Sequence, residues 1–394
     1  MEGKGQGLPD AGRPVDRRRR AFRTAWQGVL LAVVTTVLFV EGALRPAVWW
    51  LDARRQEQAA LGAVADVRLR RALKHDFVDP VTRISYDYDM FVGWRARPNQ
   101  RGLTYTIDAA GHRSVPGSTR AARETVLLTG GSAAWSYGAS DDAHTIAADL
   151  QRRLRATGRD ASVLNFAEQA YGLRQEEQVA LDALTSIKPK VVVFIDGVND
   201  AHTVSLGRDP NHYRTYTEFT ALLEEALRQV SGSVLIMRPR DIVRSSMILR
   251  GVGALYRLTL RRSQVLPRVT EEQGRMLRAF FSERLMHLNT IFSGQGVPVV
   301  FALQPIVFVS RSPVGAEGQF TAQPDRLWWQ DAYVILQDVY HTLGTEGGLR
   351  TVDLTGVVRD EERQAYIDPV HMTDAGYDDV ASGLLAAVNQ ALGG

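Results

Sequence analysis

The chain contains no cysteine. Disulfide bonds, thiolate metal sites and a cysteine nucleophile are therefore excluded, while the cellular compartment stays open. An excess of charge of one sign is lacking too, because 47 Lys and Arg face 44 Asp and Glu, for a formal net charge of +3. This mild basicity is scattered and partly confined to the N-terminus, so nucleic-acid binding is not indicated.

Several glycine-rich and metal-binding motifs are also missing. The sequence has no G-x-S-x-G motif, which argues against the nucleophile elbow of an α/β-hydrolase. It has no phosphate-binding loop, no dinucleotide-binding loop and no cluster of metal ligands. We therefore expect neither a cofactor nor a metal.

Long apolar runs are scarce, with one exception near the N-terminus. Residues 24–40 carry no charge, and the run extends to Leu44 with Glu41 as its only ionisable residue. A helix over 24–44 spans about 30 Å, which matches a bilayer core. Residues 1–23 are polar and basic, and a basic flank favours the cytoplasmic side. We expect a basic cytoplasmic tail (1–23), a single transmembrane helix in the lipid bilayer of the cell membrane (24–44) and an extracytoplasmic remainder. The alternative is a cleaved signal peptide, for which the run is long.

The rest of the chain has ordinary globular composition, with 45% hydrophobic and 23% charged residues. Residues 45–120 read as a juxtamembrane helix or stalk (48–75) followed by a loop-rich segment. From residue 121 to 394, apolar strand-like runs alternate with helical patterns. Strands are expected at 125–129, 161–166, 190–196, 233–237, 298–303 and 350–354, and helices at 142–157, 174–187, 216–230, 270–294, 329–343 and 374–392.

Alternating strands and helices predict an α/β domain with a parallel sheet covered by helices on both faces. The run at 190–196 is apolar throughout, as a central parallel strand should be. Residues 238–266 interrupt the pattern with arginines among apolar residues. They read as a solvated helical insertion, or alternatively as a lid or a surface for anionic lipid.

A serine follows the first expected strand, in the sequence Gly130-Gly131-Ser132. Near the C-terminus, Asp368 and His371 are separated by two residues in a turn before the last helix. At this spacing the aspartate can accept the Nδ1 hydrogen of the histidine, which leaves Nε2 to serve as a general base for a serine.

Donors for an oxyanion hole follow the next two strands. Asn199 comes directly after the central strand and can aim an amide N–H across the strand ends, while Gly197 permits a tight exit and Asp200 braces the loop. After the second strand, the backbone N–H of Ala170 or of Gly172 is a further candidate, and the sequence does not decide between them.

These four segments resemble, in order, the four blocks of the SGNH (GDSL-type) hydrolase superfamily. The resemblance covers residues 121–394, and the segments GWRARPN and IDAAGHR upstream are similar to membrane-anchored bacterial members. It implies a three-layer α/β/α, flavodoxin-like fold. The implied roles are Ser132 as nucleophile, His371 as base and Asp368 as its orienting carboxylate. The oxyanion donors would be the Ser132 N–H, the N–H of Ala170 or Gly172, and the Asn199 side chain, with Gly131, Gly197 and Asp200 in support.

The sequence thus predicts a membrane-anchored, extracytoplasmic serine esterase that acts on acyl, in particular acetyl, esters of carbohydrate or lipid. One alternative is an O-acyltransferase that modifies cell-surface polysaccharide with the same triad. Another is a non-catalytic scaffold of the cell envelope with the same fold.

Overall fold

The computed structural model describes residues 22–36, 38, 39, 42, 54, 57, 61–79, 81–211, 268–360 and 362–393. The chain divides into two compact units, one of residues 1–55 with 233–263 and one of residues 56–232 with 264–394. The helix and strand expected at 216–230 and 233–237, and the insertion at 238–266, lie outside the described residues.

In the first unit, residues 22–36, 38, 39 and 42 are helical and exposed. Across the positions that the structure describes, no helix combines the length and the apolar character needed to cross a membrane. The predicted span 24–44 includes residues 37, 40, 41, 43 and 44, which lie outside the description.

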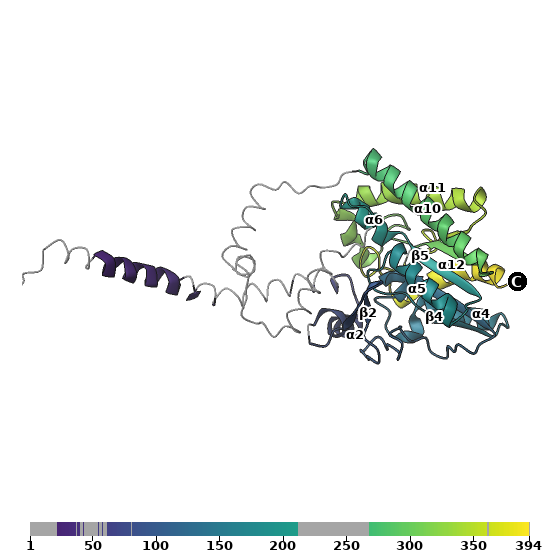
Figure 1. Ribbon diagram of the computed structural model, residues 1–394, viewed down its shortest axis with the longest axis horizontal. Helices are drawn as coiled ribbons and strands as arrows, with labels where there is room; N and C mark the ends of the chain where they lie inside the picture. Colours follow the sequence, from purple (N-terminus) through teal and green to yellow (C-terminus); the bar gives the residue numbers. More distant parts are fainter. Residues whose placement is uncertain are drawn as a thin grey trace, which may run out of the picture. The chain divides into compact units, whose positions relative to one another are not determined.

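The second unit contains a five-stranded parallel sheet with the strand order β4-β3-β5-β6-β7. Figure 1 labels β4 and β5 of this sheet. Its strands are β3 (Glu124–Gly130), β4 (Ala161–Asn165), β5 (Val191–Asp196), β6 (Val299–Leu303) and β7 (Arg350–Asp353). Numbered along the sheet's own strands, this is the order 2-1-3-4-5 of flavodoxin-like folds. The strands coincide closely with the expected apolar runs, and β5 lies in the middle of the sheet as predicted.

Helices connect the strands. They are α3 (Ser132–Trp135), α4 (Ile146–Ala156), α5 (Leu173–Ser186), α6 (Val198–Ser205), α10 (Glu271–Gly294), α11 (Arg326–Thr345) and α12 (Asp374–Ala391), with short 3₁₀ turns at Asp142–His144 and Gly315–Ala322. The crossover from β3 to β4 runs in the opposite direction along the sheet to those that follow. Because crossovers are right-handed, α4 covers one face and α5, α10 and α11 cover the other.

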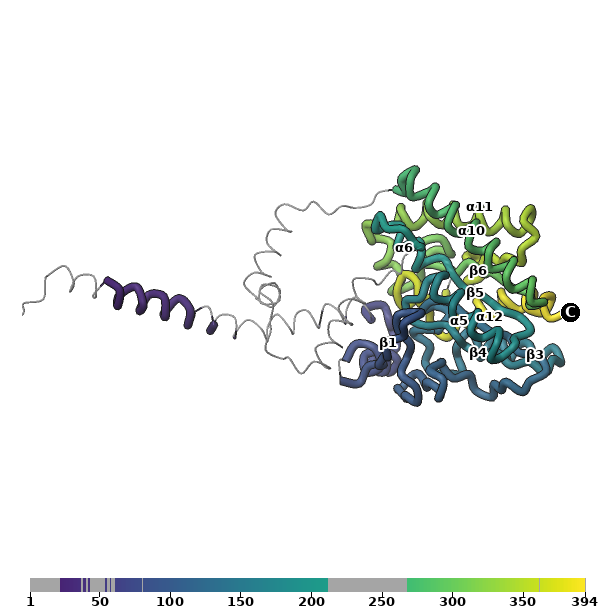
Figure 2. Tube along the Cα trace, in the orientation of Figure 1, coloured from purple at the N-terminus to yellow at the C-terminus, as the bar shows by residue number. Residues whose placement is uncertain are grey.

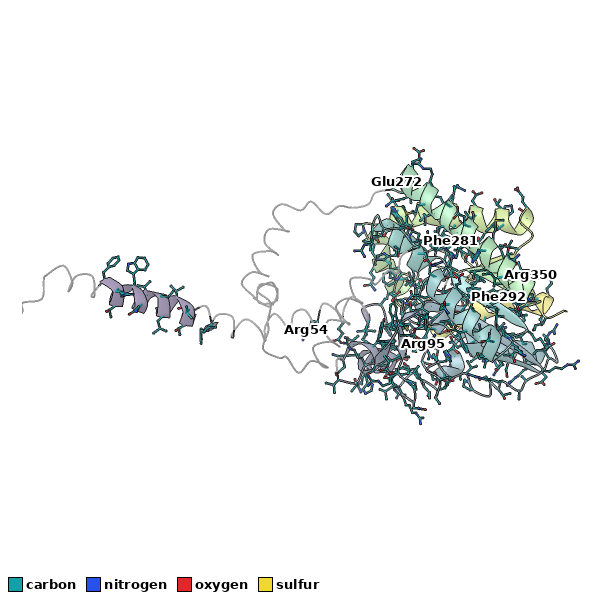
Figure 3. The ribbon with its side chains drawn as sticks, in the orientation of Figure 1. Arg54, Arg95, Glu272, Phe281, Phe292 and Arg350 are labelled. Carbon is teal, nitrogen blue, oxygen red and sulfur yellow. The ribbon has the colours of Figure 1, made fainter. Side chains whose placement is uncertain are left out.

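Packing agrees with three layers. Helix α12 packs against α4, and α10 packs against α11. Figure 2 follows the same path as a tube, with α12 near the end of the chain. Phe281 and Phe292 of α10, labelled in Figure 3, enter the core, where Phe292 meets the ring of Phe194 on β5 at 6.1 Å. All residues of β5 and β6 are buried, as expected for strands covered on both faces.

The segment at 61–120, called the upstream segment below, folds as part of this second unit. It contains α2 (Val67–Leu73), a π-helical turn (Lys74–Val78) and an antiparallel hairpin of β1 (Tyr86–Asp89) and β2 (Gly93–Ala96). The helix expected over 48–75 is interrupted at residues 62–66. Asp66 caps the new helix by accepting hydrogen bonds from the N–H groups of Arg68 and Leu69.

Candidate active site

Ser132 stands where β3 ends and α3 begins, at the carboxyl edge of the sheet. The chain approaches β5 closely there, because a Cβ at Gly130 would lie 2.6 Å from the carbonyl oxygen of Ile195. Only glycine fits that approach. The edge is where open α/β sheets place their sites.

Ser132, His371 and Asp368 form one hydrogen-bonded chain. The Nε2 atom of His371 lies 2.7 Å from Ser132 Oγ, across a sequence separation of 239 residues. The Nδ1 atom of His371 lies 2.6 Å from Asp368 Oδ2. An ionised carboxylate only accepts, so Nδ1 carries the hydrogen and Nε2 is the acceptor for the serine hydroxyl. The three residues predicted from distant segments therefore meet in the order that proton transfer requires.

The carboxylate of Asp368 is set up to stay ionised. Burial acts to raise its pKa, but the neighbouring His371 and its hydrogen bond outweigh burial, together with the N–H groups of Val370 (2.9 Å) and His371 (2.8 Å). The net result is a pKa below the usual value for aspartate. The same contacts fix the loop that carries the histidine.

An aromatic residue supports the histidine ring. The ring of Tyr137 lies 4.6 Å from that of His371, and its other neighbour is Phe77 of the upstream segment, also at 4.6 Å. Trp135, the other aromatic residue close to the serine, is fully buried. Tyr137 therefore shapes the site, whereas Trp135 belongs to the core.

Two backbone N–H groups are available for an oxyanion. The N–H of Ser132 belongs to the first residue of α3, where no intrahelical carbonyl accepts it. Ala170 lines the cleft described below, and its N–H has no acceptor within the described ranges. Gly172 does not line that cleft, and its N–H is directed to Gln175 Oε1 at 3.3 Å. Of the two candidates that the sequence left open, Ala170 lines the cleft and Gly172 does not.

Asn199 lies against the nucleophile loop. Its Nδ2 atom donates to the carbonyl oxygen of Tyr171 at 2.6 Å. A Cβ added to Gly131 would come closer than 3.0 Å to that Nδ2 atom. The absence of a side chain at Gly131 is thus what lets the Asn199 amide lie beside the residue that precedes Ser132.

Gly197 and Asp200, on either side of Asn199, both lie close to neighbouring parts of the fold. Gly197 precedes α6 with φ +134°, and a Cβ there would lie 2.8 Å from Leu303 Cδ1. Asp200 accepts a hydrogen bond from the N–H of Leu173 at 3.1 Å, at the start of α5. Asp200 therefore joins the loop after β5 to the loop after β4.

A cleft of about 480 Å³ opens over these groups. Trp329 and Phe308 supply aromatic surface, and Trp329 Nε1 donates to Asp325 Oδ2 at 3.0 Å. Trp328, next to it in sequence, is fully buried instead. The cleft is lined by Ser132, Tyr137, Gln169, Ala170, Val198, Asn199, His202, Phe308, Gln323, Asp325, Trp329, Asp368, Pro369, Val370 and His371.

Sequence reasoning missed the polar lining residues Gln169, His202, Gln323 and Asp325. A signal existed for His202, because it follows Asn199 by three residues on α6 and shares its face. Gln323 and Asp325 lie beyond the strand β6 in a long loop, where their types alone carry no signal. Over the same described part of the chain, no group of three or more His, Asp or Glu is placed to hold a metal ion.

The upstream segment also contacts the end of α3, the short helix that begins at Ser132. The buried guanidinium of Arg113 donates to the carbonyl oxygens of Trp135 (3.1 Å) and Ser136 (2.9 Å), and lies 4.3 Å from the centre of the Trp135 ring. A guanidinium can satisfy several carbonyls at once, which makes a buried charge tolerable. Arg113 thus supports α3 without lining the cleft.

No family model matches the chain, and no curated protein matches it. Among solved structures, an α/β-hydrolase enzyme from the metagenome of Lake Arreo shares 14% identity over 68% of this chain and 96% of its own, with a TM-score of 0.36. A GDSL-like lipase from Bacteroides thetaiotaomicron shares 10% identity over 68% and 89% of the two chains, with a TM-score of 0.36.

A variant of an acetyl-xylooligosaccharide esterase from Geobacillus stearothermophilus shares 14% identity over 68% and 94% of the two chains, with a TM-score of 0.39.

Proposed function

We propose that the chain is a serine esterase of the SGNH (GDSL-type) kind that hydrolyses short acyl esters. The observation that carries the proposal is the hydrogen-bonded chain from Asp368 through His371 to Ser132, at 2.6 and 2.7 Å, in a cleft that also holds the candidate oxyanion donors. A structural histidine would have no need of both a buried carboxylate on one nitrogen and a serine hydroxyl on the other.

The reaction follows from these contacts. Ser132 Oγ attacks the ester carbonyl carbon while its proton passes to His371 Nε2. The carbonyl oxygen becomes an oxyanion, stabilised by the N–H groups of Ser132 and Ala170 and by the Asn199 amide. Collapse expels the alcohol, which takes the proton from His371 and leaves an acyl group on Ser132. Water, deprotonated by the same histidine, then attacks the acyl-enzyme and releases the carboxylic acid.

The lining of the cleft suits an ester whose alcohol part is rich in hydroxyl groups. Trp329 and Phe308 offer flat apolar surface, and Gln169, Gln323 and Asp325 offer hydrogen-bonding groups beside it. We therefore propose an acetylated carbohydrate as the substrate, with an acylated lipid as the alternative. We further propose, on the sequence alone, that residues 24–44 anchor the protein in a membrane with the esterase domain outside the cytoplasm.

The test uses purified full-length protein in mild detergent and an activated acetyl ester. We expect hydrolysis that Ser132→Ala nearly abolishes, and covalent labelling of Ser132 by a fluorophosphonate probe that the same variant loses. Labelling of the wild type with hydrolysis unchanged in Ser132→Ala would contradict the mechanism. Absence of both labelling and hydrolysis would favour a non-catalytic scaffold.

Adding an acetylated or free glycan to the same assay separates esterase from transferase. An esterase releases acetate from the acetylated glycan at a rate that the free glycan does not divert. Accumulation of newly acetylated glycan at the expense of free acetate would instead identify an O-acyltransferase. Protease accessibility of the domain in intact cells tests the proposed side of the membrane.

A further inference from the structure

One peptide group of the candidate active site accepts a hydrogen bond from a residue outside the four segments that resemble SGNH hydrolases. The indole Nε1 of Trp94, on β2, donates to the carbonyl oxygen of Gln169 at 3.1 Å across 75 residues of sequence. That carbonyl belongs to the same peptide group as the N–H of Ala170, the candidate oxyanion donor. Trp94 is largely buried, so its N–H has exchanged water for this single carbonyl.

Residues on β2 and just before it form further hydrogen bonds with the loop after β4 and with the first turn of α5. Glu168 Oε2 accepts from the N–H of Ala96 at 2.9 Å. Tyr171 Oη donates to the carbonyl oxygen of Trp94 at 2.5 Å, and the two rings pack edge to face at 5.5 Å. Gln175 Nε2 donates to the carbonyl oxygen of Val92 at 2.7 Å. Arg95, labelled in Figure 3, follows Trp94 on the same strand.

The held peptide stands next to a strained residue. Ala170 has φ +63°, a left-handed conformation that alanine adopts at a cost. Rotation of the Gln169–Ala170 peptide group about the line between its two Cα atoms would change φ of Ala170 and so let this residue leave the left-handed conformation. The same rotation would carry the N–H of Ala170 away from the cleft and the carbonyl oxygen of Gln169 away from Trp94. The indole hydrogen bond therefore opposes the rotation.

The indole N–H has a second effect on the donor. A hydrogen bond accepted by an amide oxygen polarises the amide and strengthens its N–H as a donor. The preceding peptide group, between Glu168 and Gln169, is held as well, because Glu168 Oε1 accepts a hydrogen bond from the N–H of Gln169 at 2.8 Å. The N–H of Ala170 is thus both oriented and polarised by groups outside the triad.

We propose that Trp94 is a positioning residue for the oxyanion hole, acting through the Gln169–Ala170 peptide group. The inference deepens the proposed esterase function and rests on it. It assigns to the upstream segment a share in transition-state stabilisation, although no side chain of that segment lines the catalytic cleft.

The test is Trp94→Phe, which keeps an aromatic ring against Tyr171 and removes the N–H. The matched control is Trp328→Phe, because Trp328 is also buried and its Nε1 also donates one hydrogen bond, to Gln273 Oε1 at 3.0 Å. Trp328 does not line the cleft. Both variants are measured as full-length protein for kcat, KM, the rate of fluorophosphonate labelling and thermal stability.

We expect Trp94→Phe to lower kcat and the labelling rate about tenfold, less than the 10²–10³ that follows loss of a whole oxyanion donor. Its KM should stay within about twofold, since the effect lies in the transition state. Trp328→Phe should lose comparable thermal stability with kcat within about twofold of the wild type.

Equal losses of kcat in the two variants, or wild-type kcat in Trp94→Phe, would overturn the inference. If Trp94→Phe does not fold, replacement of Trp94 by β-(3-benzothienyl)alanine exchanges the N–H for sulfur at constant shape, and the same loss of kcat is expected. A wild type labelled at Ser132 beside a fully active Trp94 variant would refute the positioning role alone. A wild type that is neither labelled nor active would refute the esterase function as well.

Discussion

Gly131→Ala should disable an oxyanion donor without touching the triad. Gly131 has φ −78° and ψ −158°, an extended backbone whose negative φ does not require glycine. Alanine at this position causes a steric clash, because the new Cβ would come closer than 3.0 Å to Asn199 Nδ2 and would lie 3.1 Å from the carbonyl oxygen of Tyr171. The Asn199 amide is the group that must move.

The size of the effect follows from the displacement. Ordinary contact with a Cβ begins near 3.4 Å, so the amide has to shift by roughly 1 Å. A misplacement of that size can cost about 10²-fold in rate, and loss of one oxyanion donor costs about 10²–10³-fold. We therefore expect kcat to fall about 10²-fold, close to 3 kcal/mol in the barrier, with little change in KM.

A double-mutant cycle shows whether the loss passes through the amide. In Asn199→Ala the obstructing Nδ2 is gone, so adding Gly131→Ala should lower kcat by no more than about threefold further. The assay is hydrolysis of an activated acetyl ester, with thermal unfolding measured alongside. Gly356→Ala is the control, since a Cβ there meets nothing within 4 Å. Independent, multiplying losses in the double mutant, or wild-type kcat in Gly131→Ala, would refute the reasoning.

Two further predictions concern the loop after β4. Ala170→Gly should raise stability by about 1 kcal/mol, because glycine adopts φ +63° without the cost that alanine bears, and activity should persist because the N–H remains. Ala386→Gly in the exposed face of α12 should lose about 1 kcal/mol instead, and a similar loss in Ala170→Gly by thermal unfolding would contradict the strain. For Glu168, burial raises the pKa from the usual 4.5 to about 7, against the hydrogen bonds from two backbone N–H groups. The folded chain then keeps a proton that the unfolded chain releases between those values, so this group lowers stability by about 1.4 kcal/mol per pH unit as pH rises from about 4.5 to 7. In Glu168→Gln the unfolding temperature should therefore fall less steeply with pH over that range. An unchanged slope would mean that the fall comes from other groups, such as Glu176 and Asp196, whose pKa values burial also raises.

Strands β3, β5 and β6 were predictable because burial on both faces demands apolar residues at most positions. The runs at 125–129, 190–196 and 298–303 coincide closely with β3, β5 and β6. These strands are deeply buried, and their burial is the reason why they appear in the sequence as apolar runs. The hairpin of β1 and β2 was not predictable in this way. Its strands, YDYD and GWRA, are partly exposed and only four residues long, so their alternation is too short to mark them as strands.

The contact between Ser132, His371 and Asp368 was predictable for a related reason, since acid–base chemistry at a serine demands particular residue types in particular neighbourhoods. An aspartate three residues before a histidine is a local pattern, and a serine after a glycine pair is another. The choice between Ala170 and Gly172 was not predictable, because every residue except proline has a backbone N–H. The structural difference between them is that Gln175 accepts a hydrogen bond from the N–H of Gly172, whereas Ala170 lines the cleft.

The same argument explains why the contribution of the upstream segment stayed hidden. Trp94 and Arg113 act on backbone carbonyls of Gln169, Trp135 and Ser136, and a carbonyl oxygen leaves no mark in a sequence. A tryptophan that donates to such an oxygen reads like any other buried aromatic residue until the fold places it. Residues that perform chemistry can therefore be found from their types, whereas residues that hold a peptide group in position have to be found from contacts.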